Sequence, residues 1–178
     1  MPEPHKEIVN GCEFFMLHVK GGSFRMGSDK AAEPDAYEDE QPSHEVTVGN
    51  FFIGQYPVTQ ALWKAVMGKE NNPSFFQGDQ RPVEQVSWED AQVFLQKLND
   101  LTVKTRPANH FYRLPTEAEW EFAARGGDSS RMTKHAGSDK LKEVGWFADN
   151  SHGETKPIGM KDPNELDIFD MSGNVWEW

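Results

Sequence analysis

The sequence contains almost no cysteine and no long apolar run. Cys12 is the one cysteine among 178 residues, which excludes an internal disulfide and any CxxC redox or zinc-ribbon site. No apolar stretch reaches the ~18 residues that a membrane-spanning helix needs. Residues 1–11 hold no apolar segment behind a basic start, so we find no secretory signal and expect a cytoplasmic rather than a secreted protein.

Positive charge is also scarce. The chain has 18 Lys and Arg against 29 Asp and Glu, a net charge of -11. Nucleic-acid backbones and anionic membranes repel such a surface, so we expect neither as a partner. The chain has no GxGxxG motif, no phosphate loop and no Gly-x-Ser-x-Gly elbow, and its six histidines form no HxH or HxxxH pair. Nucleotide-binding motifs, hydrolase elbows and local zinc sites are therefore not indicated.

Large apolar side chains are present in the numbers that a folded core requires. Apolar residues make up 37% of the chain and include 12 Phe, 6 Trp and 7 Met. This composition excludes disorder, and the length predicts a single domain over residues 1–178. The last three residues, Trp176-Glu177-Trp178, are unusual for a terminus, because burying one indole gains roughly 2–3 kcal/mol. We expect either a tail that docks onto the domain or a domain that is incomplete at its C-terminus.

Local patterns predict an α+β fold with about three short helices and several short strands. Helices should begin after the capping residues Thr59, Ser87 and Thr116, and Gly68 and Gly126 mark two helix ends. We expect strands at residues 14–19, 23–26, 44–48, 51–54 and 111–114. The strands 44–48 and 51–54 are expected to form a hairpin around Gly49-Asn50. Residues 29–43 read as a solvated acidic loop, with a cation site as the alternative, and residues 128–178 as mainly irregular.

One irregular segment carries the residue types of a calcium site. Asp170 and Glu177 are hard oxygen ligands seven residues apart, and Gly173 between them allows a sharp turn that aims carbonyls inward. Two carboxylates and a few carbonyls are what Ca²⁺ requires. The alternative is an Asx turn followed by a core strand, and the spacing does not choose between the two.

Six segments resemble the formylglycine-generating enzyme, or sulfatase-modifying factor, family. In chain order they are GGSFRMGS (21–28), EQPSHEV (40–46), YPVT (56–59), RPVEQVSWEDA (81–91), YRLPTEAEWEFAARGG (112–127) and MSGNVWEW (171–178). The resemblance runs through almost the whole chain. It implies an elaborated C-type-lectin-like fold, with little regular secondary structure and bound calcium.

The resemblance also implies specific metal ligands. It assigns one calcium site to Asp170, the Gly173 carbonyl, the Val175 carbonyl and Glu177.

A second calcium site begins in the enzymes at the positions of Asn150 and Ser151. The loop that supplies its other ligands is shortened here, because only Gly153 and Glu154 precede Thr155.

The activity of the family needs residues that this chain does not contain. In the enzymes a pair of cysteines binds Cu(I) and, with O₂, oxidises a substrate cysteine to formylglycine; soft thiolates suit Cu(I). That pair lies downstream of the segment ending at Trp178, so we expect no catalytic residue here, and Cu(I) only if such a pair follows. Trp176 resembles a residue that lines the family's oxygen pocket, and its alternative role is core packing.

Two hypotheses remain open. The chain is either part of an enzyme of formylglycine-generating type or a non-catalytic binding module, such as a lectin-like or variable display protein on the same scaffold. The expected partner is a protein or peptide ligand. Self-association through an open C-terminal edge is a further expectation.

Overall fold

The structure is a computed structural model that describes residues 3–30 and 37–178, so residues 31–36 of the predicted acidic loop lie outside the described part. The strands are β1 (His5–Val9), β2 (Cys12–Val19), β3 (Ser23–Met26), β4 (His44–Thr47) and β5 (Phe51–Gly54). The helices are α1 (Gln60–Met67), α2 (Trp88–Leu101), α3 (Glu117–Ala124), α4 (Leu141–Val144) and α5 (Ala148–Ser151). Two 3₁₀ turns lie at Glu38–Glu40 and Gly127–Ser129. The predicted mixed class is confirmed.

The three longer helices begin where the sequence predicts. The side chains of Thr59, Ser87 and Thr116 accept hydrogen bonds from the first turns of α1, α2 and α3. At α2 and α3 the bond is reciprocal, which is the full capping box. Two one-turn helices, α4 and α5, exceed the predicted count of about three, because four residues give no periodic pattern to detect.

The predicted hairpin around Gly49-Asn50 is wrong. β4 pairs with β3 and β5 pairs with β2, both antiparallel, so residues 44–54 form one bent partner of residues 16–26. The two segments approach each other closely at the bend, where only glycine fits: a Cβ on Gly21 would lie 2.4 Å from the Gly49 carbonyl carbon. The side chain of Asn50 accepts a hydrogen bond from the Gly21 amide at 2.9 Å. Gly49-Asn50 therefore joins two sheets instead of reversing the chain.

The predicted strand 111–114 is also absent. Its backbone bonds go to a side chain: the Tyr112 amide donates to Asn99 Oδ1 and the Tyr112 carbonyl accepts from Asn99 Nδ2, both at 2.8 Å. Asn99 on α2 thus takes the place of a neighbouring strand. The backbone of Tyr112 is thus hydrogen-bonded as in a strand, but to an amide side chain instead of a second strand.

The first strand was not predicted, because its inward-facing residues include a charged one. β1 pairs with β2 from His5↔Met16 to Val9↔Cys12, giving a three-stranded sheet β1-β2-β5. Glu7 on β1 is only 3% exposed. A buried carboxylate breaks the alternation by which a strand is recognised.

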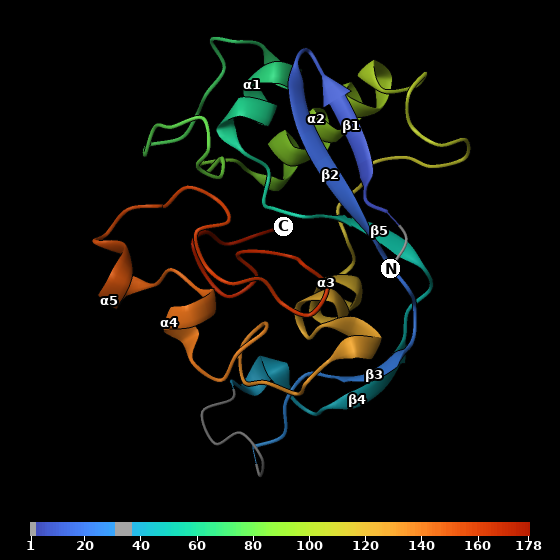
Figure 1. The fold of residues 1–178 in the computed structure, drawn as a ribbon, viewed down its shortest axis with the longest axis vertical. Coiled ribbons are helices and arrows are strands. Elements are labelled where there is room, and N and C mark those ends of the chain that lie inside the picture. The colour runs from blue at the N-terminus through green and yellow to red at the C-terminus, as the bar shows by residue number, and fades with distance from the viewer. Residues whose placement is uncertain (1–2, 31–36) are drawn as a thin grey trace.

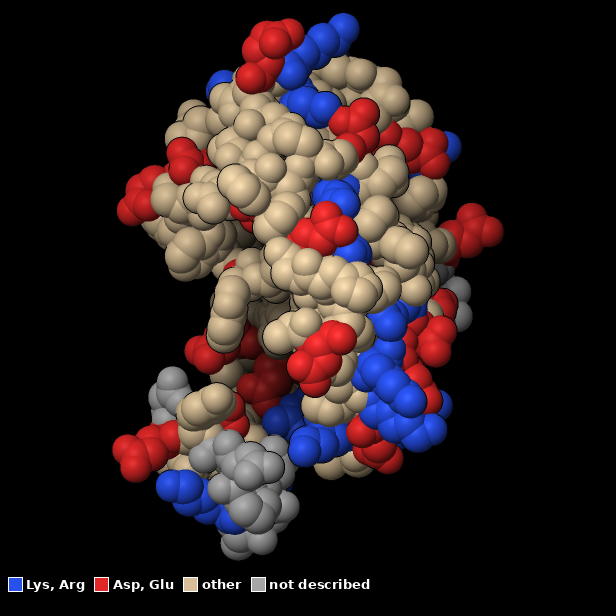
Figure 2. All heavy atoms as spheres, turned by 90° about the vertical axis from the view of Figure 1, so that its left-hand side faces the viewer, with Lys and Arg blue, Asp and Glu red and all other residues tan. Residues whose placement is uncertain are grey.

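Two apolar clusters form the core. One packs β2, β5 and α3 with Ile168 and Met171; the other packs β1 against α1 and α2, where the rings of Trp63 and Phe94 stack at 5.1 Å. The C-terminal segment runs between the part containing α1 and α2 and the part containing α3, and its end lies near the middle of the view (Figure 1). On the face that includes α4 and α5, wide uncharged areas occupy the upper part of the view, and basic and acidic side chains gather toward its lower end (Figure 2). No helix in the described ranges is long and apolar enough to span a membrane.

Candidate functional site

The C-terminal segment forms one side of a recess of about 780 Å³. The start of α3 and the 145–147 segment supply other parts of its wall. Four tryptophans line it, and the two carboxylates of the predicted calcium site lie among them. These six residues are Trp120, Trp146, Trp176, Trp178, Asp170 and Glu177.

Close backbone packing holds the 170–175 segment in place. The Asn174 amide donates to the Trp146 carbonyl at 2.9 Å, and a Cβ on Gly173 would lie 2.3 Å from that same oxygen. Gly173 has φ 146, so only glycine meets both conditions easily. The Asn174 side chain bonds both backbone groups of Lys156, at 2.8 and 3.0 Å. The turn that carries the candidate ligands is therefore fixed from two sides.

Asp170 is buried with one oxygen unused. The residue is 3% exposed; its Oδ2 accepts from the Gly159 amide at 2.8 Å, while Oδ1 has no partner among the described residues. Burial raises the pKa of the Asp170 carboxyl, and the Gly159 amide and then the Asn174 side chain oppose that rise. A buried carboxylate oxygen without a donor is costly unless a cation or water meets it.

Glu177 is the second carboxylate of the recess. Its Oε2 accepts from the indole N–H of Trp120 on α3 at 3.1 Å. Although the residue as a whole is exposed, desolvation of its carboxyl group raises the pKa of Glu177 to about 7, and the nearby charge of Asp170 adds to the rise. A cation between Asp170 and Glu177 would relieve both effects.

The oxygen atoms available in this segment are of the chemical type that calcium binds. The Gly173 carbonyl accepts from the Val175 amide at 2.9 Å, and the Val175 carbonyl has no hydrogen-bond partner in the described chain. Two carboxylates and two carbonyls, completed by water, would be hard oxygen ligands of the type that Ca²⁺ takes. No group of three or more His, Cys, Asp or Glu side chains suited to a metal occurs among the described residues. Any site here would therefore depend on backbone oxygens.

Both terminal tryptophans lie at the surface. Trp176 is fully exposed, at 102%, which does not fit the core-packing role. Trp178 is 57% exposed and donates its indole N–H to the Val86 carbonyl at 3.1 Å. Of the two terminal tryptophans, Trp178 is therefore the one that attaches the tail to the domain. The indole nitrogen of Trp146 is buried without a hydrogen-bond partner in the described ranges, and Lys161 Nζ lies 4.2 Å from the centroid of the Trp146 ring.

The residues of the second predicted calcium site face local backbone. Asn150 Oδ1 accepts from the Phe147 amide at 2.8 Å, and its Nδ2 donates to the Gly145 carbonyl at 3.0 Å. The Ser151 carbonyl accepts from the Glu154 amide at 3.4 Å. Asn150 thus caps α5, and the second site stays a prediction.

An apolar cavity of about 400 Å³ adjoins the recess between the two core clusters. Trp176 and Trp178 line this cavity as well as the recess. Cys12 reaches it from β2, and burial raises the pKa of its thiol, with Asp79 adding to the rise. A thiol with a raised pKa is mostly protonated at neutral pH, which disfavours metal binding and nucleophilic attack.

Comparison with known families identifies the family of this chain. The family model of the sulfatase-modifying factor enzyme 1-like domain matches residues 12–178. The chain belongs to this family. The fold of formylglycine-generating type and the resemblance of the six segments are thereby confirmed.

Proteins similar to this chain include a chaperone, a formylglycine-generating enzyme and a variable protein. A chaperone protein LppX of Paenibacillus barcinonensis is 35% identical, over 92% of this chain and 70% of its own. A formylglycine-generating enzyme of Mycobacterium tuberculosis is 27% identical, over 92% of this chain and 72% of its own. The solved structure of Treponema denticola variable protein 1 superposes with a TM-score of 0.84 at 30% identity, covering 100% of this chain and 76% of that one.

The structure brings the first predicted ligand set together and adds residues that the sequence did not indicate. Asp170 and Glu177 line one recess, as their spacing suggested. Trp120 and Trp146 were not predicted to join them. The stretch around Trp146 is visibly aromatic, but no local signal says that its backbone packs against Asn174, 28 positions further along.

Proposed function

We propose that this sulfatase-modifying factor domain is a calcium-organised binding module for a protein or peptide ligand. The observation that carries the proposal is the fully exposed Trp176. This residue lines both the apolar cavity and the recess that the four tryptophans surround, which we call the tryptophan recess. Exposed indoles beside an apolar cavity are typical anchors for a partner, because they bury a large area and lose little conformational entropy.

Calcium would act as the organiser of this surface. Asp170, the carbonyls of Gly173 and Val175, and Glu177 would hold it. The unused Oδ1 of buried Asp170 supports this assignment. A bound cation would neutralise two neighbouring carboxylates and fix the turn from which Trp176 projects.

The relatives support the binding role by analogy. One similar protein is named as a chaperone and another as a variable protein. Binding needs only the surface that these residues supply. We infer that the ligand is a polypeptide segment with apolar or aromatic side chains, which matches a mostly apolar cavity.

The second candidate is formylglycine generation. Its support is the 27% identity with the enzyme from Mycobacterium tuberculosis. The reaction would need two thiolates close together to hold Cu(I), and within these 178 residues Cys12 stands alone. We therefore rank binding above oxidation for this chain.

The experiment is a selection from a phage-displayed random dodecapeptide library on the immobilised 178-residue protein in Ca²⁺. We expect enriched peptides whose affinity falls about tenfold or more with Trp176→Ala. Trp88→Ala is the matched control, because Trp88 on α2 also exposes its indole, at 50%, yet lines neither the recess nor the cavity. Failure to enrich any peptide, or equal loss with both variants, would refute the proposed surface.

The competing activity is tested separately. The protein is loaded with Cu(I) and incubated with O₂ and a Cys-x-Pro-x-Arg peptide, and the peptide mass is followed. The binding role predicts no formylglycine product from this chain. Turnover would instead establish the oxidase as its function.

A further inference from the structure

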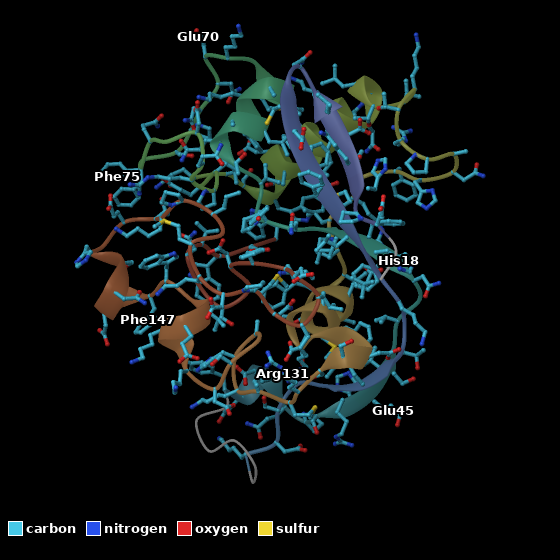
Figure 3. The ribbon with its side chains drawn as sticks, in the orientation of Figure 1. His18, Glu45, Glu70, Phe75, Arg131 and Phe147 are labelled. Atoms are coloured by element: carbon cyan, nitrogen blue, oxygen red, sulfur yellow. The ribbon has the colours of Figure 1, made fainter. Side chains whose placement is uncertain are left out.

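A second groove lies between the β1-β2-β5 sheet and residues 106–115. It shares Pro115 with the tryptophan recess and borders the apolar cavity at Met16 and Tyr112. Its volume is about 490 Å³, and none of residues 170–178 lines it. His18 on β2 pairs with Phe52 on β5 in the sheet register, so both side chains project from the same face. Figure 3 labels His18 at the lower end of β2, next to β5. The sheet therefore supplies one wall of this groove, and the 106–115 segment the other.

The groove has an aromatic wall. The ring of Phe52 meets His18 at 5.2 Å and His110 at 5.8 Å, both edge-on, at interplanar angles of 73° and 79°. Phe52 remains 37% exposed, and Phe111 on the opposite wall is 66% exposed. These exposed rings leave apolar surface against which another planar ring can stack.

The carboxylates of this groove already have partners. Glu7, 3% exposed, accepts at 3.3 Å from the hydroxyl of Tyr112, which lines the groove. Burial first, and then Glu7, raise the pKa of Tyr112, so this hydroxyl stays protonated. Glu119 accepts two bonds from Arg113, at 2.7 and 2.6 Å. Neither carboxylate is left to pair with a further cation.

Arg106 lines the groove and has no counter-ion among the described residues. Its Nε donates to the His110 carbonyl at 2.7 Å, and its Nη1 donates to the Asn99 carbonyl. It forms no ion pair with any described carboxylate, although the chain carries a net charge of -11. Two backbone carbonyls thus fix the guanidinium at the groove, and its Nη2 has no hydrogen-bond acceptor among the described residues. Held guanidinium groups are the preferred protein ligands of carboxylates.

We propose that this groove binds an aromatic carboxylate. The ring of the ligand stacks against Phe52, between His18 and His110, and its carboxylate meets Arg106. The volume lies within the range of small-molecule sites and admits one or two fused rings. The same chemistry occurs in a free aromatic acid and at the C-terminal Phe of a peptide. The inference does not depend on the function proposed for the tryptophan recess.

The test titrates three probes into the 178-residue protein, with calorimetry and amide NMR as readouts. The probes are indole-3-acetate, Gly-Gly-Phe with a free carboxylate, and Gly-Gly-Phe amide. We expect at least one free carboxylate to bind, to shift the amides of residues 52 and 109–112, and to bind at least about tenfold more tightly than the amide. Binding of only the acid or only the peptide identifies the source of the ligand and supports the groove. Absence of binding by both carboxylates, or equal affinity for the amide, overturns the proposal.

Substitutions of groove residues then test whether they contribute to the binding affinity. Arg106→Gln should weaken binding about tenfold or more, while Lys104→Gln, which removes the same charge from an exposed neighbouring position, should leave it within about twofold. Because Arg106 also braces two carbonyls, Phe111→Ala is the second variant. Its ring is exposed, so it should weaken binding severalfold without lowering the melting temperature. Wild-type affinity in both Arg106→Gln and Phe111→Ala would contradict the inference.

Discussion

Trp120 on α3 donates its indole N–H to the carboxylate of Glu177 at 3.1 Å, which ties the third helix to the C-terminal segment. Trp120→Phe keeps the ring against the core but removes this bond. We expect a loss of about 1 kcal/mol in the free energy of unfolding, measured by urea denaturation. Trp88→Phe on exposed α2 surface is the control and should change stability by less than about 0.5 kcal/mol. Equal effects would show that the bond to Glu177 adds nothing.

Gln60 organises the 72–82 loop from inside the protein. It is fully buried; its Nε2 donates to the carbonyls of Phe76 and Pro82, and its Oε1 accepts from Asn72 and Gly78. Gln60→Ala leaves these groups unpaired, so we predict a destabilisation of about 2–4 kcal/mol in chemical denaturation. Gln96→Ala, at an exposed position of α2, should have little effect. A mild phenotype for Gln60→Ala would mean that water replaces the amide.

Glu119 gives the stability a specific dependence on pH. The bonds from Arg113 first, and then those from Thr116, hold the pKa of Glu119 at about 2, below the ordinary value of 4.5. A lowered pKa stabilises the fold above the ordinary value, and that stabilisation is lost as the pH falls from 4.5 towards 2. Glu119→Gln should therefore cost about 1–2 kcal/mol at pH 7, and the difference from wild type should shrink between pH 4.5 and pH 3.

The control for that experiment is Glu117→Gln, an exposed carboxylate in the same helical turn. It shares the favourable position near the helix N-terminus but makes no described ion pair. Its effect should be a few tenths of a kcal/mol. A Glu119→Gln difference that stays constant from pH 7 to pH 3 would rule out the titration of Glu119 as its cause.

Cys12 should be an unreactive thiol. Burial and then Asp79 raise its pKa, so little thiolate exists near neutral pH. At pH 7.5 we expect Ellman's reagent to label folded protein at least about tenfold more slowly than glutathione, and unfolding in urea to remove the difference. Labelling of the folded chain at the glutathione rate would show that the thiol is accessible and ionised.

The helix starts could be predicted because capping is local. Thr59, Ser87 and Thr116 each bond an amide three residues away, and such a contact is visible in the sequence. Strand partners are not visible in the same way. The residues around Gly49-Asn50 have the composition of a turn, yet close packing against Gly21 makes them a bend between two sheets.

The candidate site shows the same division. The spacing of Asp170 and Glu177 around Gly173 is a local pattern, and it led to the residues that line the recess. The contribution of Trp120 depends on packing across 57 residues, and Arg106 acquires its role only when α2 and the 106–115 segment meet. Sequence patterns predict which groups can bind, whereas the tertiary structure decides which of them are left without a partner.

The most direct test of the account is calorimetric titration of Ca²⁺ into metal-free protein, with melting temperature as a second readout. We predict one Ca²⁺ bound per chain, a melting temperature that rises with Ca²⁺ and falls back with EDTA, and loss of both signals in Asp170→Ala. Asp149→Ala, an exposed carboxylate outside the proposed ligand set, should retain them. A wild-type protein that binds no Ca²⁺ and melts unchanged with EDTA would contradict the account.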